Sequence, residues 1–194
     1  MNRAADVAVA GLGLALAGPF LAAAALAIKL DDGGPVLFRQ TRVGKDGKDF
    51  ELVKLRSMSV GAEHLGAGFA VDQGDARITR VGRALRRLSV DELPQLWNVL
   101  RGDMSVIGPR PTLRYQVDRY TDRQRRRLEV RPGLTGLAQV NGRATLAWDD
   151  RIELDVWYVD NRSPLVDLKI LLRTPLALFG GTYKGTTGGW RAEE

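Results

Sequence analysis

The sequence of 194 residues contains no cysteine and only one histidine, His64. The absence of cysteine excludes disulfides, thiolate metal sites and a cysteine nucleophile. His64 lies in a polar, glycine-rich stretch, residues 61–74, which predicts a solvated loop, so we do not assign it to a site. There is also no low-complexity tract and no internal repeat. The composition, 44% hydrophobic and 27% charged, and the length are those of one globular domain with a real core.

The charge is unbalanced toward basic residues, with a formal net charge of +6. Of the 29 basic residues, 23 are arginine. The arginine guanidinium matches phosphate oxygens in two-point contacts better than lysine does. The positive charge therefore indicates an anionic partner: a diphosphate substrate, an anionic lipid surface or nucleic acid. Net charge alone does not distinguish these three partners.

An apolar run near the N-terminus, residues 7–28, contains no charged residue. At about 1.5 Å per residue it forms roughly 33 Å of helix, enough to cross a bilayer core. Three interpretations are open: a cleaved signal peptide, a spanning helix, and a helix that enters one leaflet and returns. A signal peptide would end at the Ala-Leu-Ala near Leu26, but its basic start would be Arg3 alone, offset by Asp6.

The Gly18-Pro19 pair near the middle of this run favours the re-entrant interpretation. Proline removes a backbone donor and clashes with the preceding turn, so we expect a kink there. The backbone groups that a break frees in lipid need local partners. Basic residues flank the run on both sides, Arg3 before it and Lys29 after it, so both flanks have the character of cytoplasmic segments.

Two β-prone runs, residues 35–41 and 48–55, flank a turn centred on Lys45-Asp46-Gly47. An Asp-Gly turn between such runs predicts an antiparallel hairpin. Residues 77–88 have helical periodicity, with apolar residues on one face and arginines around the rest. This helix either packs on the core or lies in the membrane interface with its arginines toward lipid phosphates.

Residues 165–179 are apolar but interrupted by charges and by Pro175. Because charged residues are costly in the hydrocarbon region, we do not expect this segment to cross a bilayer. It either caps the core or rests on the membrane. The chain after it has the composition of a loose tail.

The densest chemistry lies in residues 89–111, which contain the adjacent carboxylates Asp91 and Glu92. Ser89 and Glu92 also have the spacing of a capping box, so the pair has a purely structural interpretation. The functional interpretation is that one carboxylate attacks a phosphorus atom, which divides one transfer into two steps. Such an attack brings like charges together, so cations must neutralise them.

Suitable cation-binding and anion-binding groups lie in the same segment. Asp91, Glu92 and Asp103 are hard oxygen ligands of the type that Mg²⁺ prefers. Arg110, held between Pro109 and Pro111, offers a guanidinium on a stiff backbone that loses little entropy on binding phosphate. An ordinary turn arginine is the alternative.

The segment 89–111 closely resembles the core signature of the bacterial sugar transferases, the monotopic phosphoglycosyl transferases. The resemblance implies that Asp91 is the nucleophile and that Glu92 assists with metal or proton handling. It also implies that Arg110 contacts phosphate and that Arg86, five residues before Asp91, belongs to the site. The family's re-entrant helix is usually broken at a Ser-Pro pair; here Gly18-Pro19 stands in that place, without the serine hydroxyl.

Three further blocks resemble family segments in the same order along the chain: residues 54–58, 131–143 and 155–161, the last followed by Asp167-Leu168-Lys169. Several blocks in the correct order are far more specific than any one of them. The site residues that these blocks imply are Lys54, Arg143, Asp155 and Asp167.

The resemblance implies an enzyme that transfers a sugar 1-phosphate from a UDP-sugar to undecaprenyl phosphate, with Mg²⁺ as cofactor. UMP is released through a covalent aspartyl-phosphosugar intermediate, in the first membrane step of glycoconjugate assembly. The expected location is the cytoplasmic face of the bacterial inner membrane. The sugar, the exact polyprenol and the oligomeric state stay open, and the chain resembles the short form of the family or a trimmed long form.

The expected fold class is α+β, mostly helical, with a small antiparallel β-hairpin and an N-terminal re-entrant membrane helix. We expect residues 1–30 to form that helix and residues 31–194 a cytosolic, interface-associated catalytic domain. The alternative function is a membrane-tethered basic protein that binds anionic lipid or nucleic acid through residues 121–127. That run lacks interleaved aromatic residues, so we expect no nucleic-acid partner.

Overall fold

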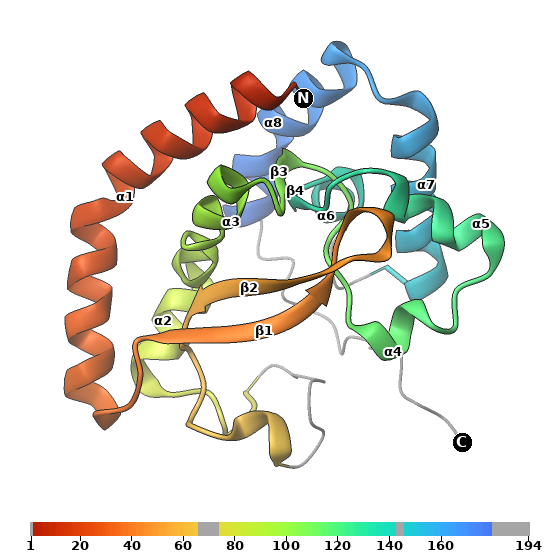
Figure 1. Ribbon diagram of the computed structural model, residues 1–194. Coiled ribbons are helices and arrows are strands. Elements are labelled where there is room, and N and C mark those ends of the chain that lie inside the picture. Colours follow the sequence, from red (N-terminus) through yellow and green to blue (C-terminus); the bar gives the residue numbers. More distant parts are fainter. Residues whose placement is uncertain (1, 66–73, 143–145, 180–194) are drawn as a thin grey trace.

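The computed structural model describes residues 2–65, 74–142 and 146–179. It is mainly helical with a small antiparallel hairpin, which confirms the α+β class (Figure 1). The helices are α1 (Arg3–Asp32), α2 (Arg80–Arg87), α3 (Gln95–Arg101), α4 (Arg114–Val117), α5 (Asp122–Arg125), α6 (Leu137–Val140), α7 (Trp148–Asn161) and α8 (Pro164–Phe179). The strands are β1 (Leu37–Val43), β2 (Asp49–Leu55), β3 (Ser105–Ile107) and β4 (Gly133–Thr135), and the 3₁₀ turns are η1 (Lys45–Gly47), η2 (Ala62–His64), η3 (Val90–Glu92) and η4 (Arg126–Glu129).

The predicted hairpin is confirmed. Strands β1 and β2 pair antiparallel, with Leu37 opposite Leu55 and Val43 opposite Asp49. The turn between them, η1, contains Asp46 and Gly47, both with positive φ (56° and 74°), the conformation that an Asp-Gly pair adopts at low cost. The hairpin lies across the helices in Figure 1. Its strand β2 therefore carries the 54–58 block onto the body of the domain.

A second, parallel strand pair was not predicted from the sequence. Strand β3 pairs with β4, and the loops that follow and precede them lie in direct contact. A Cβ on Gly133 would lie 2.0 Å from the backbone nitrogen of Gly108, and a Cβ on Gly108 would lie 2.4 Å from the carbonyl oxygen of Arg131. Only glycine permits this approach. The start of the Gly-Pro-Arg-Pro segment therefore packs directly against the backbone of the 131–143 block.

Helix α1 runs along the outside of the domain and bends about midway, with Pro19 inside it (Figure 1). The helix continues through Gly18-Pro19, so the predicted kink occurs without a break in helical structure. One face, including Ala10, Ala24 and Ile28, is buried against α2, α3 and β3. The opposite face exposes large apolar side chains: Val7, Val9, Leu12, Leu16, Phe20, Leu26 and Leu30. Within the described residues, α1 is the only helix that is long and apolar enough to cross a membrane.

Both ends of α1 are fastened to the domain. At the N-terminal end, Arg3 donates to the carbonyl oxygens of Val99 (2.5 Å) and Leu100 (2.7 Å). The buried Asp6 accepts hydrogen bonds there as well. At the other end, Asp32 forms an ion pair with Arg56. The two ends of the apolar helix are therefore tied to the same globular body.

The predicted helix at residues 77–88 is confirmed as the shorter α2, which Thr79 caps by accepting a hydrogen bond from the Gly82 nitrogen (2.9 Å). A Cβ on Gly82 would lie 2.0 Å from the carbonyl oxygen of Ser57, so α2 touches the backbone of the 54–58 block. Leu85 packs in a core cluster with α1 residues. The apolar face of α2 therefore packs on the core, while Leu88 at its end is 60% exposed.

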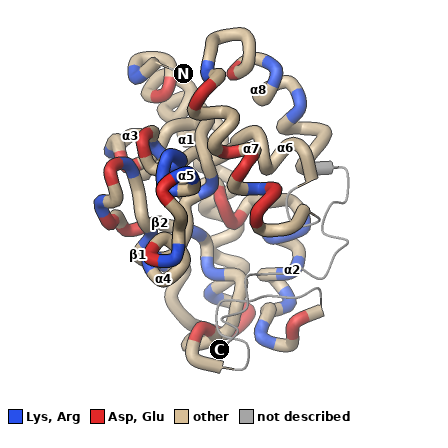
Figure 2. The backbone as a smooth tube through the Cα atoms, turned by 90° about the vertical axis from the view of Figure 1, so that its right-hand side faces the viewer, with Lys and Arg blue, Asp and Glu red and all other residues tan. Residues whose placement is uncertain are grey.

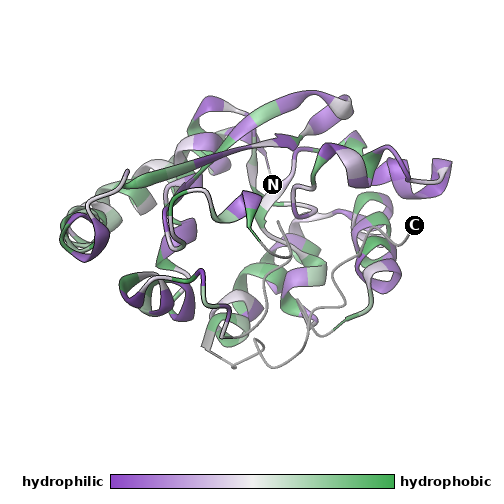
Figure 3. Ribbon diagram, turned by 90° about the horizontal axis from the view of Figure 1, so that it is seen from below, coloured by the Kyte–Doolittle hydropathy of each residue, from purple (hydrophilic) through white to green (hydrophobic). Residues whose placement is uncertain are grey.

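Helix α8 covers the segment for which core and membrane positions were both predicted. Ile170 is buried in the central core cluster with Leu52 and Val99. The outer face exposes a leucine stripe, Leu165, Leu168, Leu172 and Leu176. Helix α8 therefore carries apolar residues both toward the core and in an outer stripe, with Lys169 and Arg173 also exposed. Figure 3 shows hydrophobic and hydrophilic residues mixed along the helices of the domain.

Asn98, in α3, connects that helix to the hairpin. Its side chain is fully buried, accepts a hydrogen bond from the Val53 nitrogen (3.0 Å) and donates one to the Glu51 carbonyl oxygen (2.7 Å). Because α3 begins directly after the Asp91-Glu92 pair, this contact fixes the pair relative to strand β2.

Candidate active site

Asp91 and Glu92 lie in η3, the turn between α2 and α3. Ser89 has a left-handed conformation (φ 54°, ψ 22°), which is uncommon for a residue with a side chain. Its side chain makes no capping hydrogen bond, so the capping box suggested by the sequence does not form. Strained backbone of this kind persists only where the surroundings enforce it, and it is concentrated at functional sites.

Cations from two other elements converge on the Asp91-Glu92 pair. Glu92 Oε1 lies 3.2 Å from Nζ of Lys54 on strand β2 and 2.6 Å from Nη2 of Arg110. Arg86, at the end of α2, acts electrostatically on Asp91 together with these two cations. The structure thus brings together five of the residues predicted from the sequence: Lys54, Arg86, Asp91, Glu92 and Arg110.

Burial and the neighbouring Glu92 raise the pKa of Asp91 above its usual value. Asp91 is 8% exposed, and within the described part of the chain its side chain makes neither a hydrogen bond nor an ion pair. A desolvated carboxylate without a fixed partner is destabilised and available for bond formation. Asp91 is therefore the less restrained of the two carboxylates, whereas Glu92 is held in place by its two cations.

Arg42 on strand β1 is a further cation of this cluster, and the sequence motifs did not predict it as a site residue. Burial, with the nearby positive charge of Arg110, lowers the pKa of Arg42 to about 10. Burial likewise lowers the pKa of Lys54. Burial disfavours the charged form of both side chains, and a bound anion would favour it. Arg42 lies outside the motif blocks, and only the register of the hairpin places it here.

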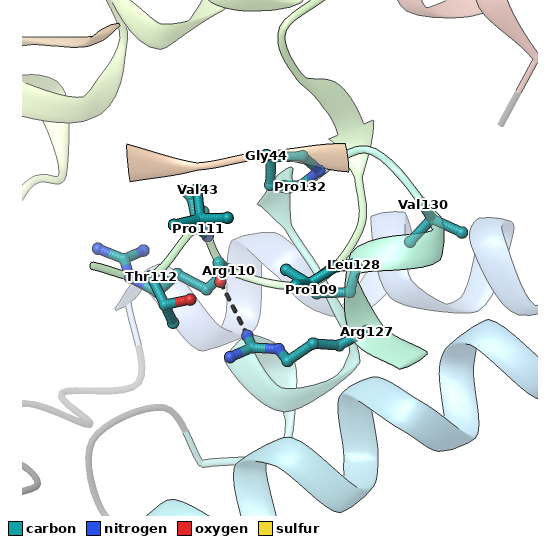
Figure 4. A pocket seen from close by; sticks show the side chains of 10 residues that line it. All are labelled: Val43, Gly44, Pro109, Arg110, Pro111, Thr112, Arg127, Leu128, Val130 and Pro132. Carbon is teal, nitrogen blue, oxygen red and sulfur yellow. Dashed lines mark hydrogen bonds between the residues drawn. The ribbon is translucent and has the colours of Figure 1, made fainter. Parts of the chain in front are cut away.

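The side chain of Arg127, a residue that is 4% exposed, binds the backbone of Arg110. Nη2 of Arg127 donates to the Arg110 carbonyl oxygen (2.8 Å), as Figure 4 shows, and to Asp155 (2.5 Å). Its Nη1 donates to the Tyr120 hydroxyl (2.5 Å), which in turn bonds Thr112 (3.1 Å). Arg127 therefore holds the chain on both sides of Pro111, at Arg110 directly and at Thr112 through Tyr120. The carboxylate of Asp155 neutralises the charge of Arg127.

Two predicted site residues lie in other surroundings, and one lies outside the described residues. Asp155 is 2% exposed and pairs with Arg127 rather than with the Asp91-Glu92 pair. Asp167, at the start of α8, accepts a hydrogen bond from the Tyr158 hydroxyl (2.7 Å). Arg143, the third predicted residue, lies outside the described residues.

Asp103, a candidate metal ligand, does not join the cluster. It lies beyond the opposite end of α3 from Asp91, where it pairs with Arg101 (3.4 Å). No group of three or more metal-ligating side chains occurs within residues 2–65, 74–142 and 146–179. The Asp91-Glu92 pair still fits Mg²⁺, because this ion is usually held by one or two carboxylates together with substrate phosphates and water.

The basic run at residues 121–127 is largely neutralised by neighbouring carboxylates. Arg123 pairs with Glu153 (2.7 Å), Arg126 pairs with Asp160 (2.7 Å), and Arg127 is buried against Asp155. Figure 2 shows basic and acidic segments interleaved around α5 and α7. This arrangement gives no uniformly basic face for nucleic acid.

The Asp91-Glu92 pair lies among cations, an arrangement with the charges that phosphate chemistry uses. Comparison with known proteins specifies the family. The family described as bacterial sugar transferase matches residues 1–181. The chain belongs to this family.

Relatives with assigned activities support the same conclusion. The chain is 49% identical over 181 residues to a UDP-glucose:undecaprenyl-phosphate glucose-1-phosphate transferase of Caulobacter vibrioides, a match that covers 89% of this chain and 67% of that protein. It is 45% identical over 188 residues to a UDP-N-acetylgalactosamine-undecaprenyl-phosphate N-acetylgalactosaminephosphotransferase of Aeromonas hydrophila, which covers 93% of this chain and 44% of that protein. It is 50% identical over 147 residues to the uncharacterized sugar transferase EpsL of Bacillus subtilis, which covers 76% of this chain and 71% of that protein. The chain thus spans between less than half and about 70% of these relatives' lengths.

Proposed function

We propose that this protein transfers a sugar 1-phosphate from a UDP-sugar to undecaprenyl phosphate and releases UMP. The observation that carries the proposal is the unpaired, buried Asp91 carboxylate beside Glu92, Lys54 and Arg110. The names of the Caulobacter and Aeromonas relatives give the same reaction type with different sugars at similar identity. Sequence identity to these relatives therefore does not identify the sugar that this protein transfers.

The proposed reaction has two steps. In the first, a carboxylate oxygen of Asp91 attacks the phosphorus that carries the sugar, and the bond from that phosphorus to the UMP oxygen breaks. UMP leaves with the electron pair of that bond, and the phosphosugar stays on Asp91 as an acyl phosphate. In the second, a phosphate oxygen of the polyprenol attacks the same phosphorus. The Asp91 carboxylate is then released, and the product is a polyprenyl diphosphate sugar.

The surrounding residues have separate roles in this proposal. Lys54, Arg86 and Arg110 supply positive charge where the diphosphate must lie against the Asp91-Glu92 pair. Mg²⁺ bound by Asp91 and Glu92 would neutralise phosphate charge as the leaving group departs. Glu92 also holds the Lys54 and Arg110 side chains in place through its two ion pairs.

We propose that α1 enters the cytoplasmic leaflet of the inner membrane and returns to the same side. A helix with both ends fastened to one globular body cannot cross a bilayer while that body stays on one side. Arg3 and Asp32 provide those attachments, and the bend with Pro19 inside it turns the apolar outer face toward one surface. The exposed side chains on that face would lie among the lipid chains.

The intact mass of the detergent-solubilised protein tests the first step directly. After incubation with Mg²⁺ and one UDP-sugar, without lipid acceptor, we expect a mass gain of one sugar phosphate. A panel of UDP-sugars identifies the preferred donor by the size of the adduct. The absence of any adduct, together with no UMP release after undecaprenyl phosphate is added, would overturn the proposed function.

Replacing Arg110 with alanine is expected to slow UMP release by roughly 10²- to 10³-fold, because a preorganised phosphate contact is lost. Arg114→Ala is the matched control: the two arginine side chains are almost equally exposed (46% and 45%), but Arg114 pairs with Asp49 on the hairpin. We expect Arg114→Ala to retain near-normal rates in the same assay. Equal rates for the two variants would remove Arg110 from the site.

A further inference from the structure

A cavity of ≈ 220 Å³ adjoins the Asp91-Glu92 pair on the side of α6 and α8. Glu92 and Ser89 line one part of it, and residues of β3, β4, α6 and α8 line the rest. Strands β3 and β4 and helices α6 and α8 lie together in Figure 1. The cavity is therefore continuous with the proposed active site but is not the cation cluster itself.

The wall of this cavity is mainly aliphatic, and includes Leu88, Leu93, Val106, Leu134, Val140 and Leu178. Two hydroxyls that also line it, those of Thr135 and Thr174, are already bonded to each other (2.9 Å). Thr174 also donates to the Ile170 carbonyl oxygen (2.8 Å). An apolar cavity of about 150 Å³ accepts a molecule as large as benzene, so this cavity has room for branched hydrocarbon units.

One polar group in the cavity has no partner. The Gln139 side chain is 6% exposed, and both its Nε2 and its Oε1 are buried without a hydrogen bond within the described residues. A buried amide without partners costs free energy, so it indicates a ligand that supplies a polar group at this point. The cavity therefore fits a molecule that is apolar over most of its length and polar at one end.

The neighbouring charges specify that polar end. Lys54 and Arg110 form ion pairs with Glu92, which itself lines the cavity, so they provide an anion site next to an aliphatic cavity. An amphiphile with a phosphate head and a branched hydrocarbon tail matches both parts at once. A sugar ring would instead require several free donors and acceptors along its length, and the bonded Thr135 and Thr174 do not offer them.

Exposed apolar side chains beside the cavity provide a surface for the part of the tail that extends out of it. Leu88, at one edge of the cavity, is 60% exposed. Leu172 and Leu176, on the outer face of α8, are 68% and 74% exposed. A long chain that leaves the cavity would meet these leucines before it meets water.

We propose that this cavity binds the isoprenoid units nearest the phosphate of the polyprenyl acceptor, with the Gln139 amide donating to its phosphate end. The inference rests on the proposed function for the identity of the acceptor. It assigns acceptor recognition to Leu134, Gln139, Val140 and the inner face of α8. The cation cluster, in contrast, contacts phosphate groups of both substrates, those of the donor in the first step and that of the acceptor in the second.

The test uses the full chain in detergent and two tryptophan variants on α8. Ala177 lines the cavity, so Ala177→Trp fills it, whereas Leu165→Trp adds a similar ring at the exposed start of α8, away from the cavity lining. We expect Ala177→Trp to form the sugar-phosphate adduct at the normal rate but to raise the KM for undecaprenyl phosphate about tenfold or more. Leu165→Trp is expected to leave both values within about twofold of the parent. Slower adduct formation by Ala177→Trp at an unchanged acceptor KM would assign the cavity to the sugar and overturn the inference.

A binding measurement that needs no turnover separates this inference from the proposed function. Farnesyl phosphate with a photoreactive diazirine on its first isoprene unit is crosslinked to the unaltered chain, and the labelled peptides are identified by mass spectrometry. Labels at Leu134, Val140 or Leu171 that excess undecaprenyl phosphate removes would support the inference, even if no UDP-sugar is a donor. Labels confined to the outer faces of α1 and α8 would overturn it, even if UMP release is normal.

Discussion

Asp91→Asn is expected to lower the rate of UMP release by about 10⁴-fold or more, because an amide cannot form the acyl phosphate. The change is nearly isosteric. Burial raises the pKa of Asp91, so the folded protein disfavours its ionised form, and a neutral side chain is expected to keep or raise the melting temperature. The measurements are UMP release with UDP-sugar, Mg²⁺ and undecaprenyl phosphate, and thermal unfolding of both proteins.

Asp103→Asn provides the matched control for this variant. Asp103 lies beyond the far end of α3 and pairs with Arg101, so the same chemical change there is expected to leave UMP release near normal. If Asp91→Asn also released UMP at a near-normal rate, Asp91 would have no place in the mechanism. If both variants lost activity, the effect would come from the fold around α3 rather than from the attacking carboxylate.

Arg127→Met is expected to lower the free energy of unfolding by about 3–5 kcal/mol, because it leaves a buried carboxylate without its counter-charge. Arg127 and Asp155 are 4% and 2% exposed and lie 2.5 Å apart. The loss also removes the hydrogen bond to the Arg110 carbonyl oxygen. Urea unfolding of the parent and the variant measures the change.

The pH dependence of this variant follows from the Asp155 carboxyl. Burial raises the pKa of Asp155 to about 6 even though Arg127 opposes the shift. A carboxyl whose pKa is raised in the folded state stabilises the fold at low pH, and that contribution is lost as the pH rises through the folded-state pKa. Without Arg127 the pKa rises further. The cost of Arg127→Met is therefore expected to be smaller at pH 5, where Asp155 is protonated, than at pH 8.

The double variant Arg127→Met, Asp155→Leu separates the charge effect from lost packing. Replacing both members of a buried ion pair with apolar side chains is often neutral, whereas removing one is costly. We expect the double variant to recover most of the stability at pH 8 and to lose the pH dependence. A double variant as unstable as Arg127→Met would show that the guanidinium's contacts to Tyr120 and Arg110 matter more than its charge.

Much of the candidate site could be predicted because its residues lie in short local patterns. The Asp91-Glu92 pair and the Pro-Arg-Pro segment are continuous in sequence, and the hairpin that carries Lys54 follows from its Asp-Gly turn. Asp155 was predicted from its block as a site residue, but its contact is with Arg127, which no local pattern marks. Arg42 was missed because its approach to the site depends on hairpin register and long-range packing.

The sequence by itself determined the family, the positions of α1, α2 and the hairpin, and the chemistry of the carboxylates and arginines, since these depend on local order and residue type. Only the tertiary structure decided that Asp103 and Asp91 are separated by α3, that both ends of α1 are tied to one body, and that an aliphatic cavity adjoins Glu92. The parallel β3–β4 pair was likewise decided there, because three-residue strands show no period. Contacts between distant segments depend on packing of the whole chain, and no local pattern records them.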